Sequence, residues 1–206
     1  MLFRSYDLVP IVSYIFLRGK CRYCHTSIPI RGFLIEIFGV LICMFCFYRF
    51  GFSIETILMF VIAMILLAIT MIDFDTMIIP DGLNIAMLLV SIVLMYVRHM
   101  SLLESIIGMF CISVPMILLN VLIAESFGGG DIKLMFVSGI ALGWKYSLLA
   151  AFIGILLAGS YSIYLLVSKK IDKKGHIAFG PYLSIGIFIA LSYGSEIISW
   201  YLNLMM

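Results

Sequence analysis

The sequence has few charged residues: Asp, Glu, Lys and Arg make up 12% of its 206 positions, whereas hydrophobic residues make up 64%. Soluble domains carry about a quarter charged residues, so this composition excludes an ordinary water-soluble protein. The formal net charge of +2 is also too small for the positive field of a nucleic-acid-binding protein. Within residues 57–72 the only polar side chain is Thr70, which is typical of a membrane-spanning helix.

Signals for secretion and for a multidomain architecture are missing. Residues 1–20 carry Arg4, Asp7, Pro10, Arg18 and Lys20 and have no cleavage site of a secretory signal peptide. Their apolar run, residues 8–17, is too short to cross a bilayer, so we expect them at the membrane surface; the alternative is a first span. There is no Pro- or Ser-rich linker and no internal repeat. We therefore predict a cytoplasmic basic segment with one Cys-x-x-Cys pair, residues 1–31, and a single membrane domain, residues 32–206.

Seven apolar segments follow one another along the chain. Because a helix satisfies its own backbone hydrogen bonds in lipid, we expect all seven to be helical. The fifth segment is short for a full span. The sequence thus predicts an all-α, polytopic membrane protein with about seven transmembrane helices, at residues 32–48, 54–72, 82–97, 102–124, 132–142, 146–167 and 178–204.

Lysine and arginine are divided unevenly between the two sides of this arrangement. If the N-terminus is cytoplasmic and the spans alternate, only three of the thirteen basic residues lie outside: Arg49, Arg98 and Lys145. Cytoplasmic segments carry an excess of basic residues, so the sequence predicts a cytoplasmic N-terminus. The basic residues on the cytoplasmic side are Arg4, Arg18, Lys20, Arg22, Arg31, Lys133, Lys169, Lys170, Lys173 and Lys174.

Acidic residues gather at the cytoplasmic ends of the predicted helices, where Asp73 closes the second and Asp131 opens the fifth. Charged residues at the membrane edge are costly and usually face protein or a water-filled cavity. If the fold brings the two carboxyl groups together, they share a proton. One can then act as general base on water while the other acts as general acid. This pair predicts peptide hydrolysis without a metal or a serine nucleophile.

The residues around these aspartates have alternative interpretations. Three glycines, residues 128–130, lack Cβ atoms and would let a substrate backbone approach Asp131 closely; the alternative is a flexible turn between helices. Asp81 follows Pro80 before an apolar run, which favours helix capping. We expect Lys133 to anchor at the lipid headgroups, with contact to a negative substrate group as the alternative.

Four motifs occur in order along the chain. They are residues 10–24 followed by Ile28-Pro29 and Leu34-Ile35-Glu36, then Asp73 with Ile79-Pro80-Asp81, then Gly128-Gly129-Gly130-Asp131-Ile132-Lys133-Leu134, and then Phe179-Gly180-Pro181-Tyr182. Together they resemble the bacterial type IV prepilin peptidases, which are GxGD intramembrane aspartyl proteases. The resemblance implies that Asp73 and Asp131 cleave the basic leader of prepilins or pseudopilins at the cytoplasmic face of the bacterial inner membrane. The residues expected to shape the substrate site are Gly128, Gly129, Gly130, Lys133, Pro80 and Asp81.

The same resemblance implies a second activity. Glu36 is associated in the family with N-methylation of the mature pilin by S-adenosylmethionine, whereas cleavage is expected to need no cofactor. Longer family members carry a further span and a further cysteine pair before this point, so the chain resembles a form with a truncated N-terminal region. We expect leader cleavage to be retained, and methylation stays open.

Cys21 and Cys24 have the spacing of a zinc site, but a structural zinc normally needs four ligands. Zinc is therefore not expected within one subunit. The alternative sources of further ligands are His25 and a second subunit.

Two other functions fit parts of the sequence. A proton-coupled transporter would place acids through the depth of the membrane, but Glu36 is the only acid well inside a predicted span. A non-catalytic assembly factor for a pilus or secretion system would share the same membrane pattern. Alanine variants of Asp73 and Asp131 would separate it from a peptidase.

Overall fold

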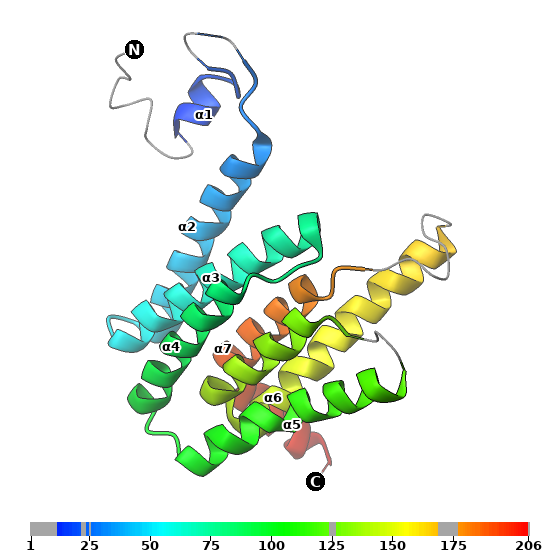
Figure 1. The fold of residues 1–206 in the computed structure, drawn as a ribbon. Coiled ribbons are helices and arrows are strands. Elements are labelled where there is room, and N and C mark those ends of the chain that lie inside the picture. The colour runs from blue at the N-terminus through cyan, green and yellow to red at the C-terminus, as the bar shows by residue number, and fades with distance from the viewer. Residues whose placement is uncertain (1–11, 22–23, 25, 124–126, 169–176, 206) are drawn as a thin grey trace. The chain divides into compact units, whose positions relative to one another are not determined.

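Figure 1 shows the fold as a computed structural model, which describes residues 12–21, 24, 26–123, 127–168 and 177–205. The chain divides into two compact units, Met1–Phe52 and Ser53–Met206. The first unit contains α1 (Val12–Phe16) and α2 (Ile30–Phe50). The second contains α3 (Ile54–Thr76), α4 (Asp81–Val97), α5 (Leu102–Leu122), α6 (Gly129–Val167) and α7 (Gly180–Met205).

The sequence predicted a domain boundary after residue 31, where polar sequence gives way to apolar sequence. The two compact units are defined by contacts between residues instead, so their boundary is a different one. The boundary after residue 31 stays a prediction. Several residues that the sequence argument used lie outside the described part of the chain: Arg4, Arg22, His25, Lys169, Lys170, Lys173 and Lys174.

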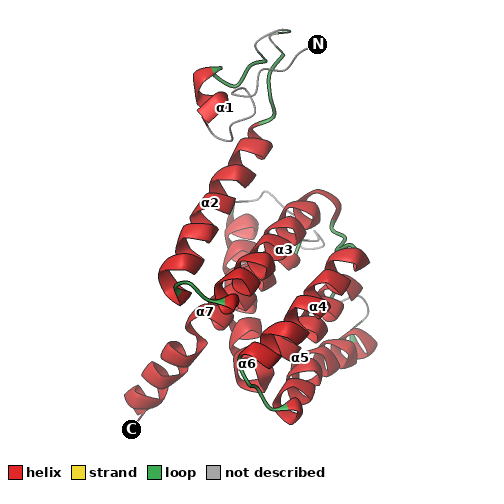
Figure 2. Ribbon diagram, turned by 90° about the vertical axis from the view of Figure 1, so that its left-hand side faces the viewer, coloured by secondary structure: helices red, strands yellow, loops and turns green. Residues whose placement is uncertain are grey.

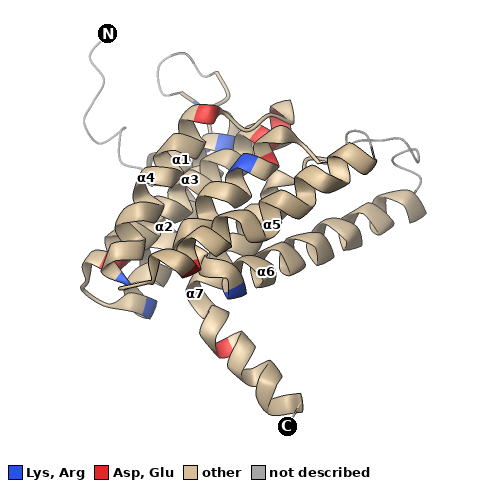
Figure 3. Cartoon of the chain, turned by 60° about the horizontal axis from the view of Figure 1, so that its bottom comes forward, with Lys and Arg blue, Asp and Glu red and all other residues tan. Residues whose placement is uncertain are grey.

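The prediction of an all-α membrane protein is confirmed. The described residues form no strand, and their only β-type pairing is an isolated bridge between Lys20 and Ser27 (Figure 2). Five of their helices are long and apolar enough to cross a membrane, namely α2, α3, α5, α6 and α7. The α4 helix is apolar but shorter, at 17 residues. Figure 3 shows few charged residues along the middle of the helices, as a lipid environment requires.

Two of the seven predicted segments lie in one helix, α6, because α6 bends at Gly143. This glycine has a φ of 65° and a ψ of 176°, which are not helical angles, and a positive φ costs glycine little. Figure 1 shows the yellow-green first half of α6 and its yellow second half running in opposite directions. The first half is about 21 Å long at 1.5 Å per residue, so it is shorter than the hydrocarbon core of about 30 Å.

Small residues allow the helices of the second unit to pack closely around α6, which contacts α4, α5 and α7. A Cβ atom on Gly108 of α5 would collide with the carbonyl oxygen of Gly139 in α6, and one on Gly186 of α7 with the carbonyl oxygen of Ala150. Close backbone approach at small residues is a common way for helices to associate in membranes. The contact at Gly139 holds the first half of α6, which carries Asp131, and the contact at Ala150 holds the second half.

Three helices are tied together by Arg98, at the C-terminal end of α4. Its Nε atom donates to Oε1 of Glu55 at 2.8 Å, and its Nη2 atom donates to the carbonyl oxygen of Leu191 at 3.1 Å. Glu55 lies in the first turn of α3 and Leu191 lies in α7. This tie therefore fixes α3, α4 and α7 relative to one another at the end away from Asp73.

In the first unit, hydrogen bonds join described residues that lie between α1 and α2 in the sequence. The amide of Cys21 donates to the carbonyl oxygen of Thr26 at 2.9 Å, and that of Ile28 donates to Gly19 at 2.8 Å. The rings of Tyr14 and Phe33 stack with their centroids 4.4 Å apart.

Candidate active site

Asp73 lies in the last turn of α3, where the chain leaves the helix sharply. Met77 has a left-handed backbone, with φ 53°, and its amide donates to the carbonyl oxygen of Asp73 at 2.9 Å. The residue is 4% exposed. Its Oδ2 atom accepts a hydrogen bond of 2.9 Å from the backbone N–H of Gly180 in α7. This buried carboxyl group is thus held in place by a donor from another helix.

Asp131 lies in the first turn of α6 and is 7% exposed. Its own amide and that of Ile132 donate to the carbonyl oxygen of Gly128, at 3.1 and 3.3 Å, and so begin the helix. Among the described residues, the Oδ1 atom of Asp131 is buried without a hydrogen-bond partner. A buried carboxyl oxygen without a protein donor leaves room for a water or a substrate group.

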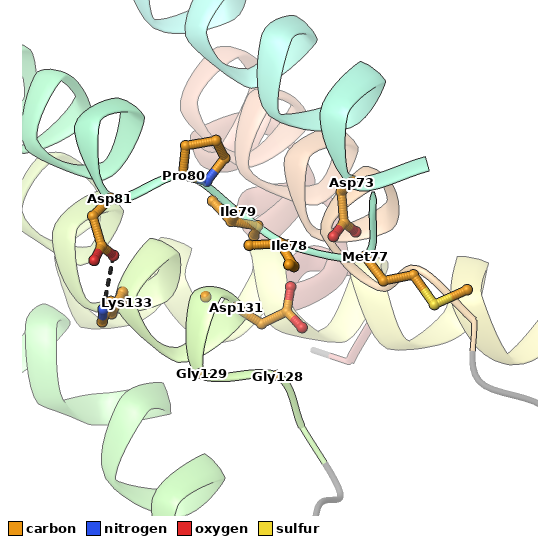
Figure 4. Close-up of a pocket in the computed structure, with 11 residues that line it drawn as sticks. Asp73, Met77, Ile78, Ile79, Pro80, Asp81, Gly128, Gly129, Asp131 and Lys133 are labelled. Carbon is orange, nitrogen blue, oxygen red and sulfur yellow. Dashed lines mark hydrogen bonds and ion pairs between the residues drawn. The ribbon is translucent and has the colours of Figure 1, made fainter. Parts of the chain in front are cut away.

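The structure brings these two distant aspartates into one pocket of about 410 Å³. Figure 4 shows both carboxyl groups pointing into the space between the Met77–Ile79 loop and Gly128, and the charge of Asp73 acts on Asp131. Two close carboxyl groups share a proton more readily than they ionise together. The residues that line the pocket are Asp73, Met77, Ile78, Ile79, Pro80, Asp81, Gly128, Gly129, Gly130, Asp131 and Lys133.

The three glycines before Asp131 have different surroundings. A Cβ atom on Gly130 would lie 2.8 Å from Cβ of Ile79, so this glycine lets α6 begin directly against the α3–α4 loop. A Cβ atom on Gly128 would lie 3.0 Å from Oδ2 of Asp131, whereas one on Gly129 would meet nothing within 4 Å. Gly130 thus serves packing, and Gly129 faces open space beside the carboxyl groups.

Asp81 and Lys133 form an ion pair at the rim of the pocket, with 2.7 Å between Oδ1 and Nζ (Figure 4). Their side chains are 69% and 58% exposed. The prediction that Asp81 caps a helix is wrong: Asp81 is the first residue of α4, Pro80 occupies the cap position, and no side chain there accepts a capping hydrogen bond. The Asp81 carboxylate is instead within reach of Lys133 because α4 and α6 begin side by side at this pocket.

From the sequence, Gly180 was noted only within the Phe179-Gly180-Pro181-Tyr182 motif, and its contact with Asp73 was not predicted. Its amide is the donor to Asp73, and a Cβ atom there would lie 2.7 Å from Oδ2 of Asp73. The signal was present in Phe179-Gly180-Pro181, because proline at a helix start is typical of a helix whose first N–H groups are free to bind elsewhere.

The remaining predicted residues lie in the first unit. Glu36 is an exposed residue of α2. Cys24 Sγ lies 2.9 Å from Oγ1 of Thr26, and this hydrogen bond lowers the pKa of the Cys24 thiol to about 7. Within the described residues no three His, Cys, Asp or Glu side chains lie close enough to hold a metal. Cys21 and Cys24 alone supply two of the four ligands that a structural zinc needs.

Comparison with known proteins finds two family models that together match most of the chain. A family model described as "Type IV leader peptidase family" matches residues 60–163, and a model described as "Bacterial Peptidase A24 N-terminal domain" matches residues 2–50. No solved structure matches the chain.

Curated relatives carry the name "Prepilin leader peptidase/N-methyltransferase". The relative from Stutzerimonas stutzeri is 30% identical over 97% of this chain and 71% of its own length. The relative from Bacillus subtilis is 31% identical over 96% of this chain and 80% of its own length. The relative from Pseudomonas aeruginosa is 30% identical over 97% of this chain and 71% of its own length.

Proposed function

The chain belongs to the type IV leader peptidase family, and we propose that it removes the leader of prepilins or pseudopilins through the carboxyl groups of Asp73 and Asp131. The observation that carries this proposal is the shared pocket, which is lined by both aspartates although they are distant in sequence. Both carboxyl groups are buried, and one has an unpartnered oxygen among the described residues.

In the proposed reaction, one carboxylate takes a proton from water, and the water oxygen attacks the scissile carbonyl carbon. The other carboxyl group donates its proton to the carbonyl oxygen. The first carboxyl group then passes the proton it took from water to the amine nitrogen as the C–N bond breaks, and a hydroxyl proton of the tetrahedral intermediate returns to the second carboxylate. The buried site keeps the two groups close in a low-dielectric environment, where one shared proton is favoured over two charges. The Gly180 amide holds the Asp73 carboxyl group throughout, so less reorganisation is needed during the reaction.

We place this chemistry at the cytoplasmic face of the bacterial inner membrane, with the N-terminus cytoplasmic. The support is the distribution of basic residues along the sequence, since ten of thirteen fall on that side. A leader that has not crossed the membrane would then meet the pocket, while its apolar helix stays in the bilayer. The open rim beside Gly129 suits the approach of an extended substrate backbone.

Methylation of the new N-terminus is a second candidate activity, because the names of the relatives include N-methyltransferase. The resemblance links Glu36 to this step, with S-adenosylmethionine as methyl donor. To test this activity, purified protein is incubated with prepilin and with S-adenosylmethionine that carries a labelled methyl group. Label on the N-terminus of the mature pilin supports methylation. Absence of label from fully cleaved pilin would restrict the chain to cleavage.

The cleavage proposal is tested with purified protein and a prepilin whose basic leader precedes an apolar helix. Mass spectrometry should find one cut at the end of the leader, and a chelator should not prevent it. Asp131→Asn should abolish the cut, whereas Asp75→Asn, an exposed residue beside Asp73, serves as the matched control and should retain it. Cleavage by Asp131→Asn at the wild-type rate would refute the aspartate mechanism.

A further inference from the structure

Asn120 lies in the last turns of α5. Its side chain forms hydrogen bonds with both backbone polar groups of Phe127, the amide and the carbonyl oxygen. Nδ2 of Asn120 donates to the Phe127 carbonyl oxygen at 2.8 Å, and the Phe127 amide donates to Oδ1 of Asn120 at 2.7 Å. One half-buried amide therefore satisfies the donor and the acceptor of a single residue. Such a two-point contact fixes the position and the direction of the chain at Phe127.

Phe127 immediately precedes the turn that presents Asp131. The next residue, Gly128, supplies the carbonyl oxygen that accepts from the Asp131 and Ile132 amides. The start of α6, and with it the direction of the Asp131 carboxyl group, therefore follows from where Phe127 is held. On the other side, Gly130 packs against Ile79 in the loop that leaves Asp73.

The ring of Phe127 also contacts the segment that supports Asp73. The centroids of the Phe127 and Phe179 rings are 5.6 Å apart, with the planes tilted by 57°. Phe179 immediately precedes Gly180, whose amide donates to Asp73. A chain of contacts thus runs from Asn120 through both phenylalanines to the donor that holds the first aspartate.

We propose that Asn120 is a positioning residue of the peptidase. By holding the backbone of Phe127, it fixes the turn that presents Asp131. Through the contact between the Phe127 and Phe179 rings, Asn120 also fixes the position of this turn relative to the Gly180 amide that binds Asp73. The inference rests on the proposed function of the two aspartates, and it adds a residue outside the pocket that acts through them.

A positioning role and a purely structural role predict different kinetics. If Asn120 only stabilised the fold, its loss would reduce the amount of folded protein and leave the turnover of each folded molecule unchanged. If it sets the geometry of the two carboxyl groups, kcat should fall in the folded protein, because misplacement of reacting groups by about 1 Å can cost about 100-fold. KM should change little, since Asn120 is not one of the residues that line the pocket.

The test uses the full chain in detergent, with prepilin as substrate and Asn120→Leu as the main variant. We expect kcat to fall by about 10- to 100-fold, with KM within about threefold of the wild-type value. The matched control is Asn203→Leu, which makes the same change at an exposed position near the end of α7 and should leave both constants unchanged. Hydrogen exchange at the Phe127 amide gives a second readout that does not depend on cleavage, and it should accelerate in Asn120→Leu.

Asn120→Asp keeps the acceptor for the Phe127 amide and loses the donor to its carbonyl. This variant should keep slow exchange at Phe127 and have a kcat between wild type and Asn120→Leu, and it carries the test if the leucine variant does not fold. Folded Asn120→Leu with kcat within about twofold of wild type would overturn the proposal, as would unchanged exchange at Phe127. If the wild-type protein cleaves no prepilin, the proposed function fails, while the exchange measurement still decides whether Asn120 holds Phe127.

Discussion

The backbone N–H of Gly180 donates a 2.9 Å hydrogen bond to Oδ2 of Asp73, although the two residues are 107 positions apart. The contact joins the start of α7 to the end of α3 directly at the proposed catalytic group. A backbone donor is well suited to this task, because it carries no charge and its position is set by the fold. Glycine is needed there because a side chain would press on the carboxyl group it supports.

Gly180→Ala should therefore slow cleavage without preventing folding. The new Cβ would lie 2.7 Å from Oδ2 and 3.1 Å from Cγ of Asp73, so the carboxyl group must move. We expect kcat for prepilin cleavage to fall by about 10- to 100-fold, as measured from initial rates. Gly159→Ala is the matched control, since a Cβ atom there meets nothing within 4 Å. Equal rates for the two alanine variants would mean that the Gly180 contact does not support catalysis.

Two ion pairs of the second unit, Arg98–Glu55 and Lys133–Asp81, should contribute very differently to stability. Arg98→Met removes the partner of Glu55 and of the Leu191 carbonyl group at a site where the Arg98 side chain is only 19% exposed. Loss of charged hydrogen bonds of this kind costs about 2 kcal/mol of unfolding free energy. Denaturant titration in mixed micelles measures the change.

Lys133→Met is the control for this comparison, because it removes a pair with side chains 58% and 69% exposed. An exposed pair contributes less than about 1 kcal/mol. A larger loss for Lys133→Met than for Arg98→Met would contradict the assigned roles of the two pairs.

The thiol of Cys24 should react with alkylating agents at unusually low pH. The hydrogen bond from Thr26 lowers the pKa of this thiol to about 7 from its ordinary 9.0, and only the thiolate reacts. Because a lowered pKa keeps the thiolate populated as the pH falls, alkylation should persist from pH 9 down to about 7 and decline below. Trypsin separates Cys24 from Cys21 by cutting after Arg22, so mass spectrometry can follow Cys24 alone.

Thr26→Val should move this pH profile upward, because it removes the largest cause of the lowered pKa. Thr26→Ser keeps the hydroxyl group and should leave the profile in place. If the pH dependence of Cys24 alkylation is the same in Thr26→Val and in wild type, the Thr26 hydroxyl group is not the cause of the reactivity.

The sequence predicted the membrane fold well because the length of an apolar segment is a local property. It placed all seven apolar segments in helices but did not predict that two of them form one bent helix, since the angles of Gly143 depend on how α5 packs against α6. It named Asp73 and Asp131 from their motifs, and the structure brings both to one pocket.

The contacts that hold the pocket together could not be predicted from the sequence. Gly180 binds Asp73 through its backbone, and Asn120 binds Phe127 through a polar side chain at a helix end. Neither a glycine nor an asparagine in a sequence predicts such a contact, because the contact forms only when distant segments meet in the fold. Asp81 was misassigned for a similar reason, since its partner Lys133 is 52 positions away and local capping was the nearer alternative.

Single-turnover cleavage by Asp73→Asn, Asp131→Asn and the double variant tests the central claim most directly. Residues that act as one catalytic unit show non-additive losses, so each single variant should fall by about 1,000-fold or more and the double variant should be no slower. Thermal unfolding in detergent checks that all three are folded. If either folded single variant kept more than about a tenth of the wild-type rate, the two aspartates would not be the catalytic pair.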